Sequence, residues 1–325
     1  MKQQIPAGLC FMHTSPGHFF YPLSEFMAKF EKPAKSDDLL VAQLIERKLL
    51  IEQPEKVKTY LSHIGYYRLS GYMHPFLKRD GTKEFQEGSH FSKVLDSYLF
   101  DKKLRQVLLD MCERIEISIK TNLCNIMALK HGPHWYLDGS HFRKYDHYQH
   151  FIHDVEEYCT ECHDSFIKHY LRKYSAPRLP PIWMIIQTLT FGQVSRLYDN
   201  LKASPERSAI AYCYGITPGI FESWLKSISF VRNCCAHHSR VWNRHFPLKP
   251  IIPTDKDKCF LATVNDDTNK RLYGTLSCML AMLEKINPNA SCRRRLKGLF
   301  REYPHVSLVE MGFTADWENS SIWKD

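Results

Sequence analysis

Long apolar runs are missing from this 325-residue sequence. No uninterrupted apolar stretch reaches about 18 residues, the shortest run that is typical of a transmembrane helix, so we expect none. Residues 1–20 also lack the continuous apolar segment of a signal peptide. The 11 cysteines are scattered and odd in number, which favours reduced thiols over a disulfide framework. These absences together predict a cytoplasmic protein.

Chain breakers and simple repeats are also scarce. The sequence has 14 glycines and 17 prolines, and it contains no low-complexity segment, so an intrinsically disordered chain is excluded. Hydrophobic residues make up 44% and aromatic residues 13%, which is enough to bury a sizeable core. Alternating strand patterns are few and short, whereas apolar spacings of three or four residues are common. The predicted class is all-α.

Acidic residues are outnumbered by basic ones. The 44 lysines and arginines exceed the 35 acidic residues by nine, and 17 histidines add positive charge at mildly acidic pH. A basic surface suggests a polyanionic partner such as RNA, DNA or a membrane surface. A merely soluble basic protein explains the charge equally well.

Helical periodicity divides the chain without marking a clear domain boundary. We expect an irregular N-terminal extension over 1–36 and a single α-helical domain over 37–325. The longest helical pattern begins at Phe91, and no proline interrupts it before Pro133. The expected helices are 37–51, 54–76, 91–130, 143–173, 181–201, 205–214, one from Pro218, and one or two over 270–301.

The stretch FVRNCCAHHSRVWNR, residues 230–244, has an unusual charge pattern. There is no acid from Lys226 to Arg244, although a solvated helix face normally mixes both signs. If one helix continues to Asn243 at about 100° per residue, the apolar residues share one arc that faces the core. Its members are Phe221, Trp224, Ile228, Val231, Cys235 and Trp242. The opposite arc holds Arg232, Asn233, Ala236, His237, Arg240, Asn243 and Arg244.

A cationic arc with one histidine suits phosphate chemistry without a metal. An arginine fork binds phosphate through two hydrogen bonds, and an imidazole accepts and donates protons near neutral pH. A base that removes the 2′-OH proton lets that oxygen attack the adjacent phosphate, while arginine stabilises the developing charge. DNA lacks the 2′-OH, so such a site would spare it. The structural alternative is a solvated basic face.

The spacing Arg-Asn-x-x-Ala-His-x-x-Arg-x-x-Asn, from Arg232 to Asn243, resembles the HEPN superfamily motif. It is most similar to the Abi-like (abortive infection, AbiD/AbiF type) proteins of bacteria. Four further stretches resemble that family in the same order along residues 38–323. They are IGYYRLSGYMHPF (64–76), LFDKKLRQVLLDMCERIEISIKTNL (99–123), WMIIQTLTFGQVSRLYDNL (183–201) and MGFTADWENSSIW (311–323).

The resemblance implies a HEPN-type helical bundle, with Arg232 and His237 as the catalytic pair of a metal-independent endoribonuclease. Asn233 would position the arginine or the phosphate. It further implies anti-phage defence, a homodimer that brings two motifs together, no cofactor, and in some members a small structured RNA as partner. The chain departs from the family at Gln187, where an acid is expected. Glu113 or Glu116 could take its place.

Other patterns have weaker chemical logic. The sequence CTECH (159–163) contains the C-x-x-C spacing of zinc sites, but it lacks a second tight pair. The segment from Tyr66 to Tyr72 mixes aromatic residues with Arg68, which suits either stacking on RNA bases or helix packing. The tryptophans of the C-terminal tail suit docking onto the bundle. A basic run contains the candidate phosphate ligands Arg293, Arg294 and Arg295, together with Lys297 and Arg301.

Three functions therefore stay open. The sequence favours a metal-independent endoribonuclease, in which Arg240, Asn243 and Arg244 bind RNA beside the catalytic pair. A second possibility is an RNA-binding defence or regulatory protein that does not cleave. A third is a non-enzymatic interaction protein.

Overall fold

The computed structural model describes residues 31–253 and 264–324, and within them it contains α-helices and no β-strand. The expected all-α class is confirmed. Three isolated bridges, such as that between Phe142 and Leu201, join segments outside the helices. The α-helices are α1 Asp37–Glu46, α2 Pro54–Ile64, α3 Tyr66–Met73, α4 Phe91–His131, α5 Tyr145–Glu161, α6 Ser165–Lys173, α7 Ile182–Thr188, α8 Phe191–Asn200, α9 Pro205–Tyr212, α10 Pro218–Ala236, α11 Leu272–Ile286 and α12 Cys292–Glu302.

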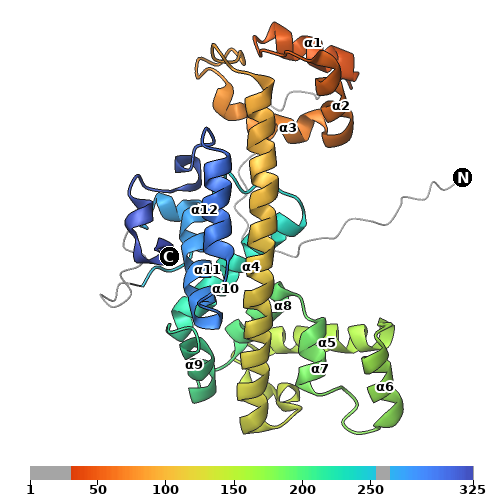
Figure 1. Cartoon of the computed structure of the whole chain (residues 1–325). Coiled ribbons are helices and arrows are strands. Elements are labelled where there is room, and N and C mark those ends of the chain that lie inside the picture. Colours follow the sequence, from red (N-terminus) through yellow and green to blue (C-terminus); the bar gives the residue numbers. More distant parts are fainter. Residues whose placement is uncertain (1–30, 254–263, 325) are drawn as a thin grey trace, which may run out of the picture.

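Helix α4 is the axis of the molecule. Its 41 residues give a length of about 60 Å, and Figure 1 shows α1–α3 at one end and α5–α7 near the other. Helices α10, α11 and α12 pack along its middle. The helix starts at Phe91, as expected, and ends at His131. The next residue, Gly132, has a φ of 87° and donates its N–H to Ala128 O at 2.8 Å.

Several helices are shorter than the sequence pattern predicts. The expected helix over 54–76 divides at Gly65, whose φ of 88° is the left-handed region that glycine tolerates. The expected helix over 181–201 divides at Thr190, which begins α8 with a reciprocal capping box to Gln193. The first helix ends at Glu46, and the one expected over 143–173 is split into α5 and α6.

The C-terminal tail docks onto the bundle, as the sequence predicts. Phe313, Trp317 and Trp323 are buried and contact one another and Phe300 of α12 through their rings. Edge-to-face aromatic contacts of this kind add to the stabilisation from area burial. The 1–36 extension falls mostly on residues outside the described part. No described helix is both long enough and apolar enough to cross a membrane.

Candidate functional site

Helix α10 carries the first half of the motif. It begins with Pro218 at its first position, where proline loses no helical hydrogen bond. The apolar arc expected on this helix is buried: Phe221, Trp224, Ile228, Val231 and Cys235 are at most 1% exposed. The expected core face is confirmed up to Cys235.

Arg232, Asn233 and His237 lie along the opposite side of α10. Arg232 is half-buried, whereas Asn233 and His237 are exposed. Arg232 Nη1 donates to Asn233 Oδ1 at 3.3 Å, and the backbone N–H of His237 donates to Asn233 O at 3.0 Å. Residues four apart share a helix face, so Asn233 and His237 project to the same solvent side, with the arginine turned toward them.

The charge of Arg232 also acts on a buried thiol of α4. Burial raises the pKa of the Cys112 thiol on α4 well above its ordinary value, and the positive charge of Arg232 opposes that rise. Glu116, one turn further along α4, raises the same pKa. Arg232 and Glu116 therefore have opposite electrostatic effects on the Cys112 thiol.

The prediction of one unbroken helix through Asn243 is wrong, because α10 ends at Ala236. His238 adopts a left-handed conformation with φ 55°. Its N–H donates to Cys235 O at 3.1 Å, and Ser239 N–H donates to Cys234 O at 2.8 Å. This pair of bonds is a Schellman termination, which normally uses glycine at the left-handed position. With histidine there, the sequence carries no such signal.

The second half of the motif therefore does not extend the polar arc of the helix. Arg240 Nη1 donates to the backbone oxygen of Gly71 in α3 at 2.6 Å. Asn243 Oδ1 accepts from Arg271 Nη1 at 3.3 Å. Arg244 Nη1 donates to Arg240 O at 3.3 Å, and its guanidinium lies over the ring of Phe230, 5.5 Å from the centroid. A role for these three side chains in RNA binding stays a prediction.

Helix α3 holds this loop from the other side. Arg68 Nη1 donates to His238 O at 2.6 Å, so the left-handed residue next to His237 is fixed by a cation from the N-terminal helices. Tyr72 is buried and Tyr67 is exposed. Within the aromatic segment 66–72, Tyr72 thus packs against the core and Tyr67 faces solvent.

Asp101 of α4 fixes the loop most firmly. Its Oδ1 accepts the N–H groups of Val241 at 3.0 Å and Trp242 at 2.7 Å. Its Oδ2 accepts from the Tyr72 hydroxyl at 2.6 Å and pairs with Arg105. Burial raises the pKa of this fully buried carboxyl, and its hydrogen bonds and the Arg105 charge oppose the rise.

Asp101 is not among the site residues that the sequence predicts. One signal was available: an acid four residues before an arginine, both within the apolar stripe of the long helix. Trp242 is buried as expected, but as part of the loop that Asp101 holds, and its Nε1 donates to Ser307 O at 3.0 Å.

Gln187, where an acid is expected, is exposed on α7. Of the two proposed substitutes, Glu113 is exposed, whereas Glu116 is largely buried and pairs with Lys120 at 2.9 Å. Only Glu116 also affects the thiol that Arg232 affects. A role for Glu116 or Glu113 in place of the expected acid stays a prediction.

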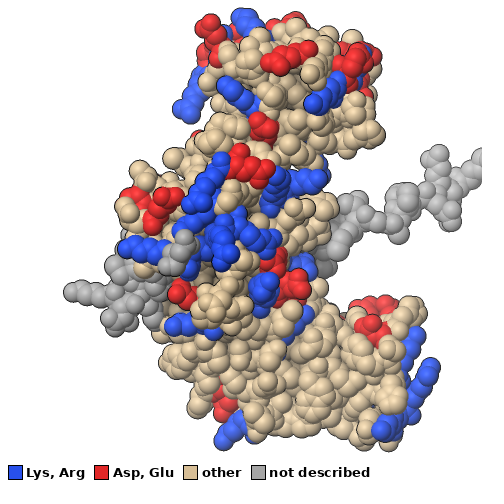
Figure 2. All heavy atoms as spheres, in the orientation of Figure 1, with Lys and Arg blue, Asp and Glu red and all other residues tan. Residues whose placement is uncertain are grey.

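The basic run lies on α12. Figure 2 shows lysine and arginine side chains gathered over this helix and the adjoining stretch of α4. Arg293 donates to Lys324 O at 2.7 Å and lies 3.5 Å from Glu284, and Arg295 pairs with Asp110. Arg294 and Arg301 are exposed and form no ion pair within the described ranges. Arg294 is thus the most accessible of the three predicted ligands on α12.

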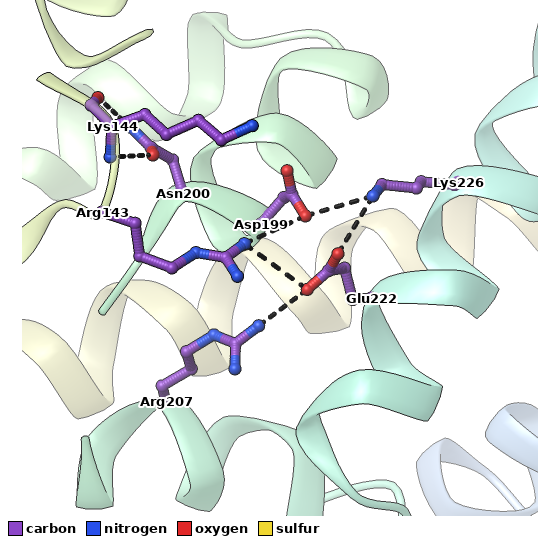
Figure 3. Close-up of polar contacts among 7 residues, drawn as sticks. All are labelled: Arg143, Lys144, Asp199, Asn200, Arg207, Glu222 and Lys226. Atoms are coloured by element: carbon purple, nitrogen blue, oxygen red, sulfur yellow. Dashed lines mark hydrogen bonds and ion pairs between the residues drawn. The ribbon is translucent and has the colours of Figure 1, made fainter. Parts of the chain in front are cut away.

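An ion-pair cluster braces α8, α9 and the start of α5 against α10. Figure 3 shows Arg143, Arg207 and Lys226 converging on Asp199 and Glu222. Lys226 lies 3.1 Å from Asp199 and 3.0 Å from Glu222, and Arg207 lies 2.8 Å from Glu222. These ion pairs join α8 and α9 to the first half of α10, before the strip of Arg232, Asn233 and His237.

The C-x-x-C pair is placed apart from the motif, with Cys159 buried in α5 and Cys162 at its C-terminal end. In the part of the chain that the structure describes, no group of three or more His, Cys, Asp or Glu residues is arranged to hold a metal ion.

A family model described as Abi-like protein matches residues 59–243, which is 243 − 59 + 1 = 185 of the 325 residues. No curated protein and no solved structure gave a match. The matched region includes α3, the whole of α4 with Asp101, and the motif to its last residue, Asn243. The chain therefore belongs to the Abi-like protein family, whose name points to abortive-infection defence.

Proposed function

We propose that this protein is a metal-independent endoribonuclease of the HEPN type that acts in bacterial anti-phage defence. The observation that supports this most is the strip of Arg232, Asn233 and His237 on the solvent side of α10. On this strip a ligand can reach both an arginine and an imidazole. The arginines of the following loop, Arg240 and Arg244, instead donate to backbone oxygens of the protein itself.

The chemistry needs two proton transfers and one charged intermediate. A histidine removes the 2′-OH proton, and the resulting oxygen attacks the adjacent phosphorus. The bond from phosphorus to the 5′-oxygen breaks, and that oxygen takes a proton. The products are a 2′,3′-cyclic phosphate and a 5′-hydroxyl end. Arg232 would stabilise the charge that develops on the phosphoryl oxygens.

The position of the strip at the end of a helix suits positively charged groups. The C-terminal end of a helix carries partial negative charge, which stabilises a guanidinium or an imidazolium nearby. Asn233 Oδ1 accepts one N–H of Arg232, so it holds the guanidinium while the remaining donors can bind phosphate. Asn233 is thus a positioning residue.

A homodimer is part of the proposal. One chain offers a single exposed histidine in the strip, whereas the reaction needs a group that takes a proton and a group that gives one. Two copies related by a two-fold axis would bring two such histidines to one phosphate.

The test is cleavage of single-stranded RNA in the presence of EDTA. Wild type is expected to cut RNA and to leave DNA of the same sequence intact. His237→Ala should reduce the rate by roughly 10²–10⁴-fold, and Arg232→Ala should do so as well. His245→Ala is the matched control, because His245 is exposed in the loop outside the strip, and its rate should equal that of wild type. Equal rates for His237→Ala and wild type would contradict the proposal.

The second candidate is an RNA-binding defence protein that does not cleave, with a small structured RNA as partner. The observation in its favour is Gln187, which is neutral where the family pattern has an acid. If wild type binds RNA, cuts none, and binds as tightly as His237→Ala, this candidate replaces the first.

A further inference from the structure

A cavity of about 290 Å³ lies between α5 and α8. This volume is near the lower end of the range for small-molecule sites, roughly 300–1,000 Å³. Apolar side chains of Phe142, Phe151 and Leu197 form one part of its wall. The polar part is formed by His147, His150, Asp154, Gln193, Arg196 and Asn200.

Hydrogen bonds fix the wall of the cavity. Asn200 clamps the backbone of Lys144: its Oδ1 accepts the N–H at 2.9 Å, and its Nδ2 donates to the carbonyl at 3.1 Å, as Figure 3 shows. Arg143 N–H donates to Asn200 O at 2.7 Å. Phe142 is buried and stacks on Tyr148 with ring centroids 4.9 Å apart. The cavity is therefore formed before any ligand arrives.

Two polar groups in the wall have donors or acceptors to spare. Arg196 is exposed, and within 31–253 and 264–324 it has no hydrogen bond or ion pair. His150 Nδ1 lies 2.6 Å from Asp146 O, so this nitrogen donates to the carbonyl and Nε2 is left for a ligand. The cavity thus pairs an aromatic wall with an unpaired guanidinium.

Arg196 lies between the cavity and the motif helix. A Cβ at Gly192 would meet Ser229 Oγ of α10 at 3.5 Å and Arg196 Nη1 at 3.7 Å. Ser229 is one turn before Asn233 on the same helix. Both distances are ordinary contacts, so Gly192 lies next to Ser229 and to the Arg196 guanidinium. This places the guanidinium near α10, the helix that carries Arg232.

We propose that this cavity holds one nucleotide, with its base against Phe142 and Phe151 and its phosphate on Arg196. Single-stranded RNA is recognised by unstacked bases that lie on aromatic side chains and by cations that follow the backbone. The strand leaving Arg196 would continue across Ser229 to Arg232, and this part of the inference rests on the proposed function. A small anion alone would leave the aromatic wall without a role.

The test uses binding in the His237→Ala background, so that RNA stays intact. The probe is a single-stranded RNA of about ten nucleotides with one photoreactive 4-thiouridine. The added substitution Arg196→Gln removes a charge-assisted contact to phosphate and should weaken binding roughly tenfold. Arg172→Gln is the matched control, an exposed arginine of α6 outside the cavity, and it should bind as the parent does.

Crosslinking locates the base directly. Irradiation should attach the RNA to the peptide 142–154, and Arg196→Gln should reduce that product. Phe151→Leu keeps apolar volume and removes the ring, so it should weaken binding roughly fivefold through lost stacking. Equal affinity of Arg196→Gln and Arg172→Gln, or crosslinks that all fall outside the cavity wall, would overturn the inference.

One comparison shows whether the cavity binds a nucleotide of an RNA strand or a free nucleotide. A second shows whether the cavity proposal and the endoribonuclease proposal fail independently. AMP and UMP are titrated with and without the RNA probe: competition supports a nucleotide of the strand, and binding without competition supports a free nucleotide in the same cavity. If RNA binds through Arg196 but wild type never cuts it, the cavity inference stands and the endoribonuclease fails. If wild type cuts RNA and Arg196→Gln binds it normally, the endoribonuclease proposal stands and the cavity inference fails.

Discussion

Arg232 and Arg240 belong to one motif, yet they have different surroundings. Arg232 lies on α10 beside two exposed polar residues, and it donates a hydrogen bond to the neighbouring Asn233. Arg240 lies in the loop after the helix and donates to Gly71 O of α3 at 2.6 Å. Both arginines are half-buried. On the helix the arginine lies beside exposed residues, whereas in the loop it joins two segments of the chain.

The site has two requirements, and different halves of the motif meet them. The helix half supplies groups that a ligand can reach, and the loop half keeps the end of α10 in place. Loss of a group that binds only ligand should leave the folded state almost unchanged. Loss of a group that satisfies buried backbone atoms leaves those atoms without partners, which costs free energy of folding.

Substitution of Asp101 should have the largest effect on stability. Asp101→Ala removes the acceptor for two loop N–H groups and the partner of Arg105. Removing one partner of a buried ion pair typically costs about 3–5 kcal/mol. Urea denaturation followed by circular dichroism measures this change. A loss below about 1 kcal/mol would mean that other contacts hold the loop. The loop half of the motif would then be no more important for stability than the helix half.

Arg240→Ala should have an intermediate effect. A hydrogen bond from a charged group contributes about 1.5–3 kcal/mol, and the carbonyl of Gly71 loses this donor. Arg232→Ala is the matched variant, with an expected change in the free energy of unfolding below about 1 kcal/mol. Equal losses for the two arginines, measured by the same denaturation, would show that Arg232 is as structural as Arg240.

His237→Ala should have the smallest effect on stability. Its imidazole is exposed, and the hydrogen bond that ends α10 comes from its backbone N–H, which alanine retains. The free energy of unfolding should stay within about 0.5 kcal/mol of wild type, while RNA cleavage is lost. A large fall in the melting temperature would instead show that the His237 side chain stabilises the fold.

Local sequence patterns predicted much of the fold. The absence of proline over 91–132 and the regular apolar spacing predicted α4, and the same spacing predicted the buried face of α10 as far as Cys235. The division at Thr190 could also have been predicted from the sequence, because threonine followed three residues later by Gln193 is a capping-box signal.

Other features depend on contacts that no local pattern encodes. The end of α10 at Ala236 relies on a histidine in a left-handed conformation, which only tertiary contacts make tolerable. Asp101 and Val241 are 140 positions apart, so their hydrogen bond is invisible to helical periodicity. Helical periodicity placed Arg232, Asn233 and His237 on one polar arc, and the family resemblance singled them out. Their catalytic role stays a prediction.

The bond from Arg68 to the carbonyl of His238 joins residues 170 positions apart. A fragment that began at α4 would contain every residue of the motif but would lack the cation that holds the turn after it. The shortest active piece of this protein should therefore reach back through α3, even though no atom of that helix need touch the RNA.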